Sequence, residues 1–377
     1  MSKTITIEKC CDILDSQRIP ITASQRKPGI YPYYGANGVQ DYVEDYIFDD
    51  ELVLLAEDGG NFGSKDKPIA YRVSGKCWVN NHAHVLKPKD GTDVDYLCYA
   101  LMFYDVSGYI NGATRQKLTQ AAMRKMAIPY LPYTEQQKIA AVLDKVTALI
   151  ADRKEQLEQL GLMVKSRFVE MFGDPVENPM GWEMPRIEDT VAEGKNSLKA
   201  GPFGSSLKKE FYVESGYKIY GQEQVIRGDA HYGDYYIDET KFRSLQSCTV
   251  QANDVLISLV GTYGKLLIIP DDFEPGIINP RLMKITFNPE KVNTAYFRYF
   301  FGSESVVRRL SENTHGGTMD ILNLGIVRKI KIPLPPIDLQ NRFADFVAQV
   351  DKARIEIQQG LEEQLLQYNA LMQRYFG

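Results

Sequence analysis

The sequence predicts a mixed α/β (α+β) fold in which two similar globular domains are separated by two long antiparallel coiled-coil helices. Three observations support this prediction. A chain of 377 residues has room for two or three domains, since a domain takes about 150 residues. One stretch of the sequence occurs twice, and its copies lie 204 residues apart. Inside both copies, apolar residues recur with the period of about 3.5 residues that is typical of coiled coils.

The repeat sets the order of the parts. Ile128-Pro129 recurs as Ile332-Pro333, and the correspondence continues without a gap until Phe172-Gly173 is matched by Phe376-Gly377. A repeat of this length indicates a repeated structural unit. We therefore expect four regions: a first globular domain at 1–127, a central region with a long helix at 128–182, a second globular domain at 183–331 and a C-terminal helix at 332–377.

The two expected globular domains contain short alternating segments and many Tyr, Gly, Asn and Asp residues. Residues 51–56 form an apolar run that is followed by Asp58-Gly59, and residues 254–260 form a similar run that is followed by Gly261-Thr262. An apolar run of this length between turn residues indicates a buried strand. Both domains are therefore expected to be of the mixed α/β type.

Each copy of the repeat predicts one long helix. Ten positions spaced alternately by four and three residues, starting at Ile139, carry eight apolar residues, and the matching positions from Phe343 also carry eight. Thr134 and Asp338 are the expected N-caps, and Gly173 is the expected stop of the first helix. Two matched helices can bury their apolar faces against each other, so we expect a coiled coil. Its predicted contact positions are Ile139, Leu143, Val146, Ile150, Leu157, Leu160, Phe343, Val347, Val350, Ile357, Leu361 and Leu371.

The composition excludes several classes of protein. With 44% apolar and 25% charged residues the chain should fold, and no stretch approaches the roughly 18 apolar residues of a membrane-spanning helix. The five cysteines include no C-x-x-C pair, which argues against a disulfide framework or a zinc site and favours a cytoplasmic location. A net charge of −5 removes the simplest argument for nucleic-acid binding, so any DNA contact must come from local clusters.

Two similar domains joined by paired helices make a pseudo-two-fold molecule on one chain. Duplex DNA offers a matching partner, because its grooves repeat about every 34 Å. Two recognition elements on a rigid spacer would therefore read two half-sites about one turn apart. A two-lobed protein-interaction scaffold without DNA specificity would use the same geometry, and it is the alternative hypothesis.

Several motifs resemble those of the specificity subunit of type I restriction-modification systems. In the first domain these motifs are Pro32-Tyr33-Tyr34-Gly35-Ala36-Asn37-Gly38 and Glu57-Asp58-Gly59. In the second domain they are Gly201-Pro202-Phe203-Gly204-Ser205-Ser206-Leu207 and Asn253-Asp254-Val255-Leu256. The flanks of the first helix resemble the central conserved region of the same family: Ile128-Pro129, Glu135-Gln136-Gln137-Lys138-Ile139 and Met171-Phe172-Gly173-Asp174-Pro175. The resemblance covers essentially the whole chain.

The resemblance implies a non-catalytic protein with two target recognition domains, each of which reads one half of a split sequence in double-stranded DNA. The helices would set the gap between the halves. Two methyltransferase (M) subunits would dock on the chain to form an adenine-N6 methylase, and two restriction (R) subunits can join them. S-adenosylmethionine, ATP and Mg²⁺ would belong to those partners. No cofactor and no membrane contact is expected for this chain.

The residues themselves give little support for catalysis. Asn178-Pro179 and Asn279-Pro280 do not continue into the N-P-P-[YF] signature of amino-methyltransferases. The segment 59–65 misses the Walker spacing of a phosphate loop. The Glu239-Thr240-Lys241 segment has the E-x-K form of some nucleases but no Pro-Asp suitably upstream. We therefore expect neither catalytic residues nor a metal site.

His82 and His84 stand two residues apart, which in a strand would place them on one face. Two histidines without a third ligand make a weak metal pair. Contact with a base or phosphate from the adjacent turn, or plain strand structure, are the other interpretations of this segment.

DNA contacts require Arg and Lys for phosphate or guanine and Asn or Gln for adenine, presented on loops that the duplex can approach. Candidates in the first domain are Asn61, Ser64, Lys65, Lys67, Asn80, Asn81, His82, Thr114, Arg115 and Lys117. Candidates in the second domain are Ser205, Ser206, Lys208, Lys209, Thr262, Lys265, Arg281 and Thr318. Solvated surface charge is the alternative for the cations, and a structural turn is the alternative for Thr114 and Thr318.

Overall fold

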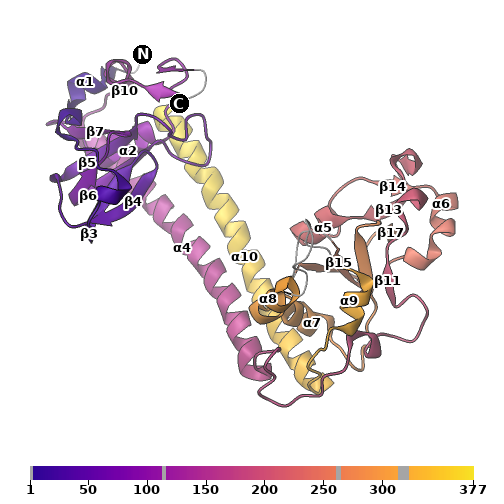
Figure 1. Ribbon diagram of the computed structural model, residues 1–377. Coiled ribbons are helices and arrows are strands. Elements are labelled where there is room, and N and C mark those ends of the chain that lie inside the picture. The colour runs from indigo at the N-terminus through magenta and orange to yellow at the C-terminus, as the bar shows by residue number, and fades with distance from the viewer. Residues whose placement is uncertain (1–2, 113–115, 260–264, 313–321) are drawn as a thin grey trace. The chain divides into compact units, whose positions relative to one another are not determined.

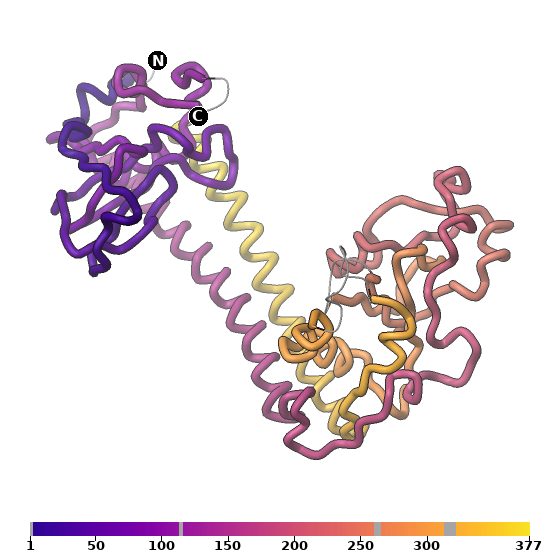
Figure 2. Tube along the Cα trace, viewed as in Figure 1, coloured from indigo at the N-terminus to yellow at the C-terminus, as the bar shows by residue number. Residues whose placement is uncertain are grey.

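The computed structural model describes residues 3–112, 116–259, 265–312 and 322–377. The chain forms two compact units: the first consists of Met1–Glu155 and Gln358–Gly377, and the second of Gln156–Ile357. Each unit therefore contains one globular region together with parts of both long helices. Figure 2 shows the yellow C-terminal segment beside the indigo N-terminal region of the first unit. In the described part of the chain, no helix is both long and apolar enough to cross a membrane.

A six-stranded sheet forms the centre of the first unit (Figure 1). β3 and β6 of this sheet are parallel, with Tyr34 opposite Val79, whereas its other neighbouring strands are antiparallel. In spatial order the strands are β2 (Cys11–Ile13), β7 (Ala83–Pro88), β5 (Phe48–Ala56), β6 (Ala70–Val79), β3 (Pro28–Gly35) and β4 (Gly38–Val43). The remaining strands are β1 (Thr4–Thr6), which pairs with β10 (Ala127–Pro129), and β8 (Ile110–Asn111), which pairs with β9 (Lys117–Leu118).

The apolar run of β5 is continuous because both faces of the strand are covered. Val53 and Leu55 belong to the core beneath α2 (Val94–Met102), and Leu52 and Leu54 belong to a separate core on the other face. All of these side chains are fully buried. The shorter helices of this unit are α1 (Ile7–Cys10) and α3 (Gln120–Met123).

Two four-stranded sheets form the second unit. β13 and β17 are parallel, with Tyr220 opposite Ile278, so both units contain one parallel strand pair in otherwise antiparallel surroundings. The first sheet has the order β11 (Leu198–Ala200), β18 (Leu282–Ile285), β15 (Val255–Ser258), β16 (Leu266–Ile268), and the second has the order β12 (Tyr212–Val213), β14 (Tyr236–Ile237), β13 (Tyr217–Tyr220), β17 (Gly276–Ile278). The helices are α5 (Gln222–Arg227), α6 (Glu239–Ser244), α7 (Thr294–Phe301), α8 (Glu304–Glu312) and α9 (Leu324–Lys329). The mixed α/β class expected from the sequence is confirmed.

The two long helices are α4 (Tyr133–Phe172) and α10 (Ile337–Phe376), each of 40 residues. Gly173 ends α4 in the left-handed conformation, with a φ of 76°, as expected of a glycine at this position. The predicted N-caps are wrong by position, because Thr134 and Asp338 lie inside the first turn. The carbonyls of Pro132 and Pro336 accept the first helical hydrogen bonds instead.

The two helices pack against each other in antiparallel fashion within each unit. In the first unit the start of α4 shares a core with Leu371 and its neighbours at the end of α10. In the second unit Phe168 and Phe172 at the end of α4 share a core with Phe343 at the start of α10. Of the predicted contact positions, the buried ones are Ile139, Leu143, Val146, Ile150, Phe343, Val347, Val350 and Leu361, and the half-buried ones are Leu157, Leu160, Ile357 and Leu371.

A buried glutamine at the start of α4 fastens this helix to the first domain. The Gln136 side chain is 2% exposed. Its amide nitrogen donates to the carbonyls of Leu131 (2.8 Å) and Gly91 (3.0 Å), and its amide oxygen accepts from the backbone of Asp93 (2.9 Å). Asp93 is in turn the N-cap of α2. One side chain therefore joins the starts of two helices.

Gln340 at the start of α10 makes the same three bonds in the second unit. It is fully buried, donates to the carbonyls of Pro335 (2.8 Å) and Lys291 (2.9 Å), and accepts from the backbone of Asn293 (2.9 Å). Asn293 is the N-cap of α7. The repeated glutamine thus has one structural role in both halves of the chain.

A buried tyrosine in each domain contacts both long helices or their lead-in. The Tyr96 hydroxyl donates to the carbonyl of Pro129 at 3.1 Å, and its ring lies 5.2 Å from that of Phe376 at the end of α10. In the second unit the Tyr296 hydroxyl donates to Pro333 at 2.7 Å, and its ring lies 4.8 Å from that of Phe172 at the end of α4. Each domain therefore holds the start of its own helix and the end of the other one.

Candidate nucleic-acid interface

The first group of candidates lies on one loop of the first unit, between β5 and β6. The loop folds on itself: the Asn61 side chain donates to the carbonyl of Pro68 at 3.5 Å, and the Ser64 hydroxyl accepts from the backbone of Lys67 at 3.0 Å. Lys65 and Lys67 are exposed, and neither forms an ion pair with any described residue. This loop presents two solvated cations on an ordered turn.

The second group lies where β5 ends and β7 begins. Asn80 is 3% exposed and accepts the backbone N–H of His82 at 2.8 Å. The His82 ring meets the Asp58 carboxylate at 2.5 Å, and Lys117 pairs with Glu57 at 2.9 Å. The exposed Asn81 completes this turn. The structure therefore brings Asn80, His82 and Lys117 together around the acidic segment 57–58.

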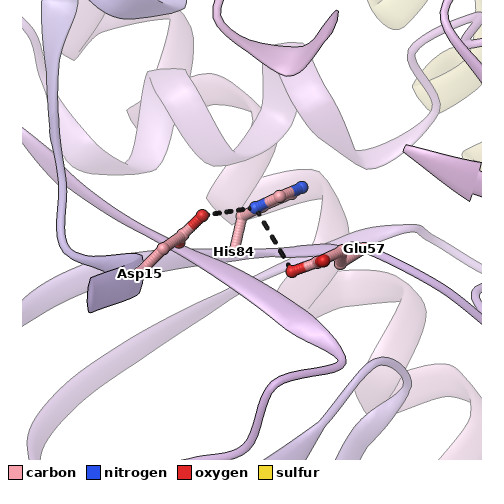
Figure 3. A group of neighbouring side chains, drawn as sticks. All are labelled: Asp15, Glu57 and His84. Carbon is pink, nitrogen blue, oxygen red and sulfur yellow. Dashed lines mark hydrogen bonds and ion pairs between the residues drawn. The ribbon is translucent and has the colours of Figure 1, made fainter. Parts of the chain in front are cut away.

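A buried ionic cluster lies beneath this turn (Figure 3). Asp15, Glu57 and His84 place one possible ligand atom each within 4.8 Å of one another. His84 Nδ1 faces Asp15 at 2.7 Å, and His84 Nε2 donates to the carbonyl of Leu118 at 2.8 Å. Both ring nitrogens are thus already engaged with oxygen atoms of the protein. No ring nitrogen of His84 is left over as a ligand for a metal ion.

The carboxylates of the cluster are also occupied by cations and amides. Arg18 binds Glu57 at 2.7 Å, and Lys117 binds the other oxygen of Glu57 at 2.9 Å. Asp15 accepts from the backbone of Val85 at 2.9 Å and from the Gln120 amide at 2.9 Å. The residues therefore do not fit a metal ion. They form a network that ties distant segments of the first domain together.

The strand that was considered for both histidines contains only one of them. His84 is in β7 and fully buried, whereas His82 is in the preceding turn with a side chain that is 37% exposed. The turn interrupts the alternation, because the Asn80 side chain caps the His82 backbone there.

The ionic network sets the charge state of its carboxylates. Burial on its own would raise the pKa of Asp15, but the hydrogen bond and charge of His84 outweigh burial and lower it. Burial would likewise raise the pKa of Glu57, but hydrogen bonds from Arg18 and Lys117 lower it. Both carboxylates therefore stay ionised in the folded protein at pH values where the same groups in the unfolded chain bind protons.

Acid should weaken the first unit through these carboxylates. A pKa that is lower in the folded state gives stability at neutral pH that is lost as the pH falls below the ordinary carboxyl value of about 4. Replacing Asp15 with Asn should cost about 3 kcal/mol near neutral pH, because it breaks a buried ionic network. The cost should shrink toward zero in acid, where the wild-type carboxylate is also protonated.

Thermal unfolding of wild type and D15N from neutral to acidic pH measures this difference. The exposed Asp66 supplies the matched control, D66N, which should track the wild type at every pH. A difference in stability between wild type and D15N that stays the same at every pH would contradict the assignment of a lowered pKa to Asp15.

In the second unit, the segment 201–209 forms an exposed loop that begins beside the Asn279 turn. A Cβ at Gly201 would lie 1.9 Å from the Asn279 carbonyl oxygen, so only glycine allows this approach. Phe203 is 87% exposed. Ser205, Lys208 and Lys209 are also exposed and Ser206 is half-buried. Lys208 lies 3.7 Å from Glu210, a contact between two exposed side chains.

Arg281 is exposed at the start of β18. Its guanidinium donates to the Gln222 side chain at 3.3 Å, and Gln222 donates to the Ser258 hydroxyl at 2.8 Å. The Arg281 backbone N–H donates to the Asn279 side chain at 2.9 Å. Arg281 is therefore anchored at both backbone and side chain.

Lys265 lies apart from Arg281, in an open groove of about 1010 Å³ between the second half of α4 and the helices α5, α7 and α8. Lys165, Arg227 and Arg298 line the same groove. Among the described residues these four cations form no ion pair. The same lining also holds Arg354 and the carboxylates of Glu170, Asp174 and Glu304, so cations outnumber carboxylates in the groove although the whole chain is acidic.

Some candidates cannot be placed, and some important residues were not among them. Thr114, Arg115, Thr262 and Thr318 lie outside the described residues. Sequence reasoning missed the supporting groups around the turns, which are Asp15, Arg18, Asp58, Gln222, Ser258 and Asn279. A usable signal existed for the last of these, since an apolar residue, Asn, one variable residue and a basic residue occur at 79–82 and again at 278–281.

Comparison with known proteins shows the family to which the chain belongs. The family model described as "Type I restriction modification DNA specificity domain" matches residues 2–159 and 181–367. The chain belongs to this family. The first matched region contains the candidate loops of the first unit, and the second matched region contains those of the second unit. Membership confirms the resemblance noted in the sequence, and it also confirms that the chain is not itself an enzyme but a DNA specificity component of the type I restriction-modification class.

Individual relatives and solved structures agree. The S.HindORF215P chain of Haemophilus influenzae, which carries the description of a type I restriction enzyme specificity subunit, is 27% identical over 94% of this chain and 89% of its own length. The MjaVIII specificity subunit of Methanocaldococcus jannaschii is 22% identical over 92% of this chain and 84% of its own. The crystal structure of a type I S subunit from M. genitalium has the same fold, with a TM-score of 0.64 at 14% identity, covering 100% of this chain and 96% of that one.

Proposed function

We propose that this specificity subunit reads a split DNA target, with one half contacted by each unit and the gap set by α4 and α10. The observation that carries the proposal is the duplicated arrangement: each unit presents an anchored polar turn and exposed lysines, and each is fastened to the long helices by the same glutamine, Gln136 or Gln340. A duplicated reader on a helical spacer fits two half-sites at a fixed distance.

We propose that two methyltransferase subunits bind the long helices, one at each unit. Both helices carry large apolar side chains that the chain itself leaves exposed, and such side chains mark interaction surfaces when they gather. On α4 these are Val142, Leu149, Leu162, Met163 and Val169, and on α10 they are Ile355, Leu365 and Leu366. Two restriction subunits would join the assembly through the methyltransferases.

The chemistry of the assembly would reside in those partners. S-adenosylmethionine, ATP and Mg²⁺ would bind the methyltransferase and restriction subunits. In the described part of this chain, the cluster of metal-ligand residue types is satisfied by its own ion pairs, which supports placing the Mg²⁺ in those partners. A cytoplasmic location fits this role, and the five cysteines, all buried free thiols, are compatible with a reducing compartment.

Salt titration tests the DNA contacts. The complex of this chain with its methyltransferase subunit should bind a mixed-sequence duplex with an affinity that falls steeply as salt rises, because each phosphate that is neutralised releases counterions. Replacing Lys65 or Lys265 with Ala should reduce the slope of log K against log salt by about 0.9 per lost phosphate contact. Fluorescence anisotropy of a labelled duplex measures the slope.

The matched control is K27A, which removes an exposed lysine that pairs with Glu44 and should leave the slope unchanged. Equal slopes for K65A, K265A and wild type would contradict the contact assignment. Binding that does not depend on salt in any of these proteins would favour the two-lobed scaffold without DNA specificity.

A further inference from the structure

The two units contain the same turn at the same place in their sheets. In the first unit β3 and β6 end side by side, and the backbone N–H of Asn80 donates to the carbonyl of Tyr34 at 3.0 Å. In the second unit β13 and β17 end side by side, and the backbone N–H of Asn279 donates to the carbonyl of Tyr220 at 2.9 Å. Asn80 and Asn279 therefore occupy equivalent positions, directly after the second strand of the parallel pair.

The residues that follow are also equivalent. The Asn80 side chain accepts the backbone N–H of His82 at 2.8 Å, and the Asn279 side chain accepts that of Arg281 at 2.9 Å. The carbonyl of His82 accepts from the backbone of Glu57 at 2.8 Å, and that of Arg281 accepts from Leu259 at 2.9 Å. The hydrogen bonds on both sides thus place His82 and Arg281 at one structural position.

A third bond extends the match to the repeated part of the chain. The carbonyl of Glu57 accepts from the backbone of Leu118 at 2.8 Å, and the carbonyl of Leu259 accepts from Leu322 at 3.0 Å. Leu118 and Leu322 correspond in the sequence repeat, being 204 residues apart. The correspondence of the turns is therefore continuous with that of the helices, although Asn80 and Asn279 are 199 residues apart.

The two turns have the same backbone hydrogen bonds, but they present different side chains. His82 is held through Nδ1, which meets the Asp58 carboxylate at 2.5 Å, and its side chain is 37% exposed. Arg281 is exposed and held through one guanidinium nitrogen, which donates to Gln222 at 3.3 Å. In both units the protein fixes one end of the group, and the side chain is at least partly exposed to solvent.

We propose that His82 and Arg281 are the corresponding specificity-determining residues of the two units, each reading one base at the same place in its own half of the target. This inference rests on the proposed function. An anchored guanidinium suits guanine, whose O6 and N7 accept two hydrogen bonds. A ring that donates through Nδ1 to Asp58 has Nε2 left as an acceptor, which suits the exocyclic amine of adenine or cytosine.

Anchoring distinguishes these two residues from the candidate lysines. Lys65 and Lys265 are exposed and form no ion pair with described residues, which suits contact with phosphates that are alike at every position. His82 and Arg281 are fixed at backbone and side chain, and a reader must be fixed to distinguish one base edge from another. The same backbone with a different side chain would let the two units read different bases.

Methylation of a randomised duplex library by the complete complex of this chain and its methyltransferase subunit tests the inference. Adenine methylation is read at base resolution for wild type, R281A, R281K, H82A and H82R. R281A and R281K should each lose about tenfold in discrimination at a single guanine in one half of the motif. H82A should relax one position in the other half, and H82R should create a preference for guanine there.

The controls are K27A in the first unit and R243A in the second. Both remove exposed cations that pair with a neighbouring glutamate, Glu44 or Glu239, and both should reproduce the wild-type motif. Thermal unfolding and assembly with the methyltransferase verify that each variant is folded, and the conservative R281K keeps the charge.

The outcomes separate the inference from the proposed function. A wild-type complex that yields no split motif contradicts the proposed function and this inference with it. A split motif that R281A and H82A leave unchanged, or weaken equally for all sequences, contradicts the inference alone. A change that falls in both halves at once also contradicts it, since each residue belongs to one unit.

Discussion

Inserting one heptad into each long helix should lengthen the gap between the two halves of the DNA target by about three base pairs. Seven residues add about 10.5 Å of helix, and the rise of duplex DNA is about 3.4 Å per base pair. A heptad also turns the helix by only about 20° from its former face, so the apolar seam is kept. The insertions belong after Glu155 in α4 and after Ile357 in α10, where the two compact units meet in the sequence.

The matched control is a heptad in α4 alone. It should misalign the antiparallel seam beyond the insertion, because Phe168 and Phe172 would lose their partners near Phe343, and methylation should fall strongly. Methylation of the same randomised library measures both the length of the gap and the level of activity. A paired insertion that leaves both gap and activity untouched would show that the helices do not set the distance. The bases of both half-motifs should stay the same, because the insertion changes only the helices. A change in either half-motif would contradict the proposal that the domains read the bases and the helices set the gap.

Replacing Gln340 with Leu should destabilise the second unit by about 3 kcal/mol, since it leaves three backbone groups without partners at about 1 kcal/mol or more each. Those groups are the N–H of Asn293 and the carbonyls of Lys291 and Pro335. Hydrogen–deuterium exchange should rise at the starts of α7 and α10. Q136L should have the same effect in the first unit, where Gln136 makes the equivalent bonds.

The control for both substitutions is Q358L on α10. Gln358 is exposed, and among the described residues its side chain bonds only to Glu362 on the same helix. Its loss should therefore change stability by less than about 0.5 kcal/mol. If Q340L and Q358L show the same hydrogen–deuterium exchange at the starts of α7 and α10, Gln340 does not fasten α10 to the second domain.

The helices and the two-domain order were predictable because their signals are local or periodic. The apolar spacing from Ile139 and from Phe343 follows from the geometry of a helix pair, and Gly173 marks a helix end through its backbone freedom. The predicted N-caps were wrong by two residues. Thr134 and Asp338 are typical cap types, but the carbonyls of Pro132 and Pro336 accept the first helical hydrogen bonds. Cap preference is a statistical signal that neighbouring backbone geometry overrides.

The candidate site was predictable only in outline. Local composition pointed to His82, Lys117 and Arg281, but their anchors come from distant segments of the chain. These anchors are Asp58, Glu57 and Gln222. The equivalence of the two turns was hidden from a comparison at a fixed shift, because loops of different length change the offset within the domains. Hydrogen-bond register revealed it, since register depends on the strands and not on loop length.

The most direct test of the account is a base-resolution adenine-methylation map from cells that carry this chain with its methyltransferase subunit, compared with cells that lack only this chain. The account predicts a split motif, two short specific halves around a fixed non-specific gap, that disappears when the chain is deleted. An unchanged methylation pattern, with the methyltransferase subunit shown to be expressed in both, would contradict the claim that this chain selects the target.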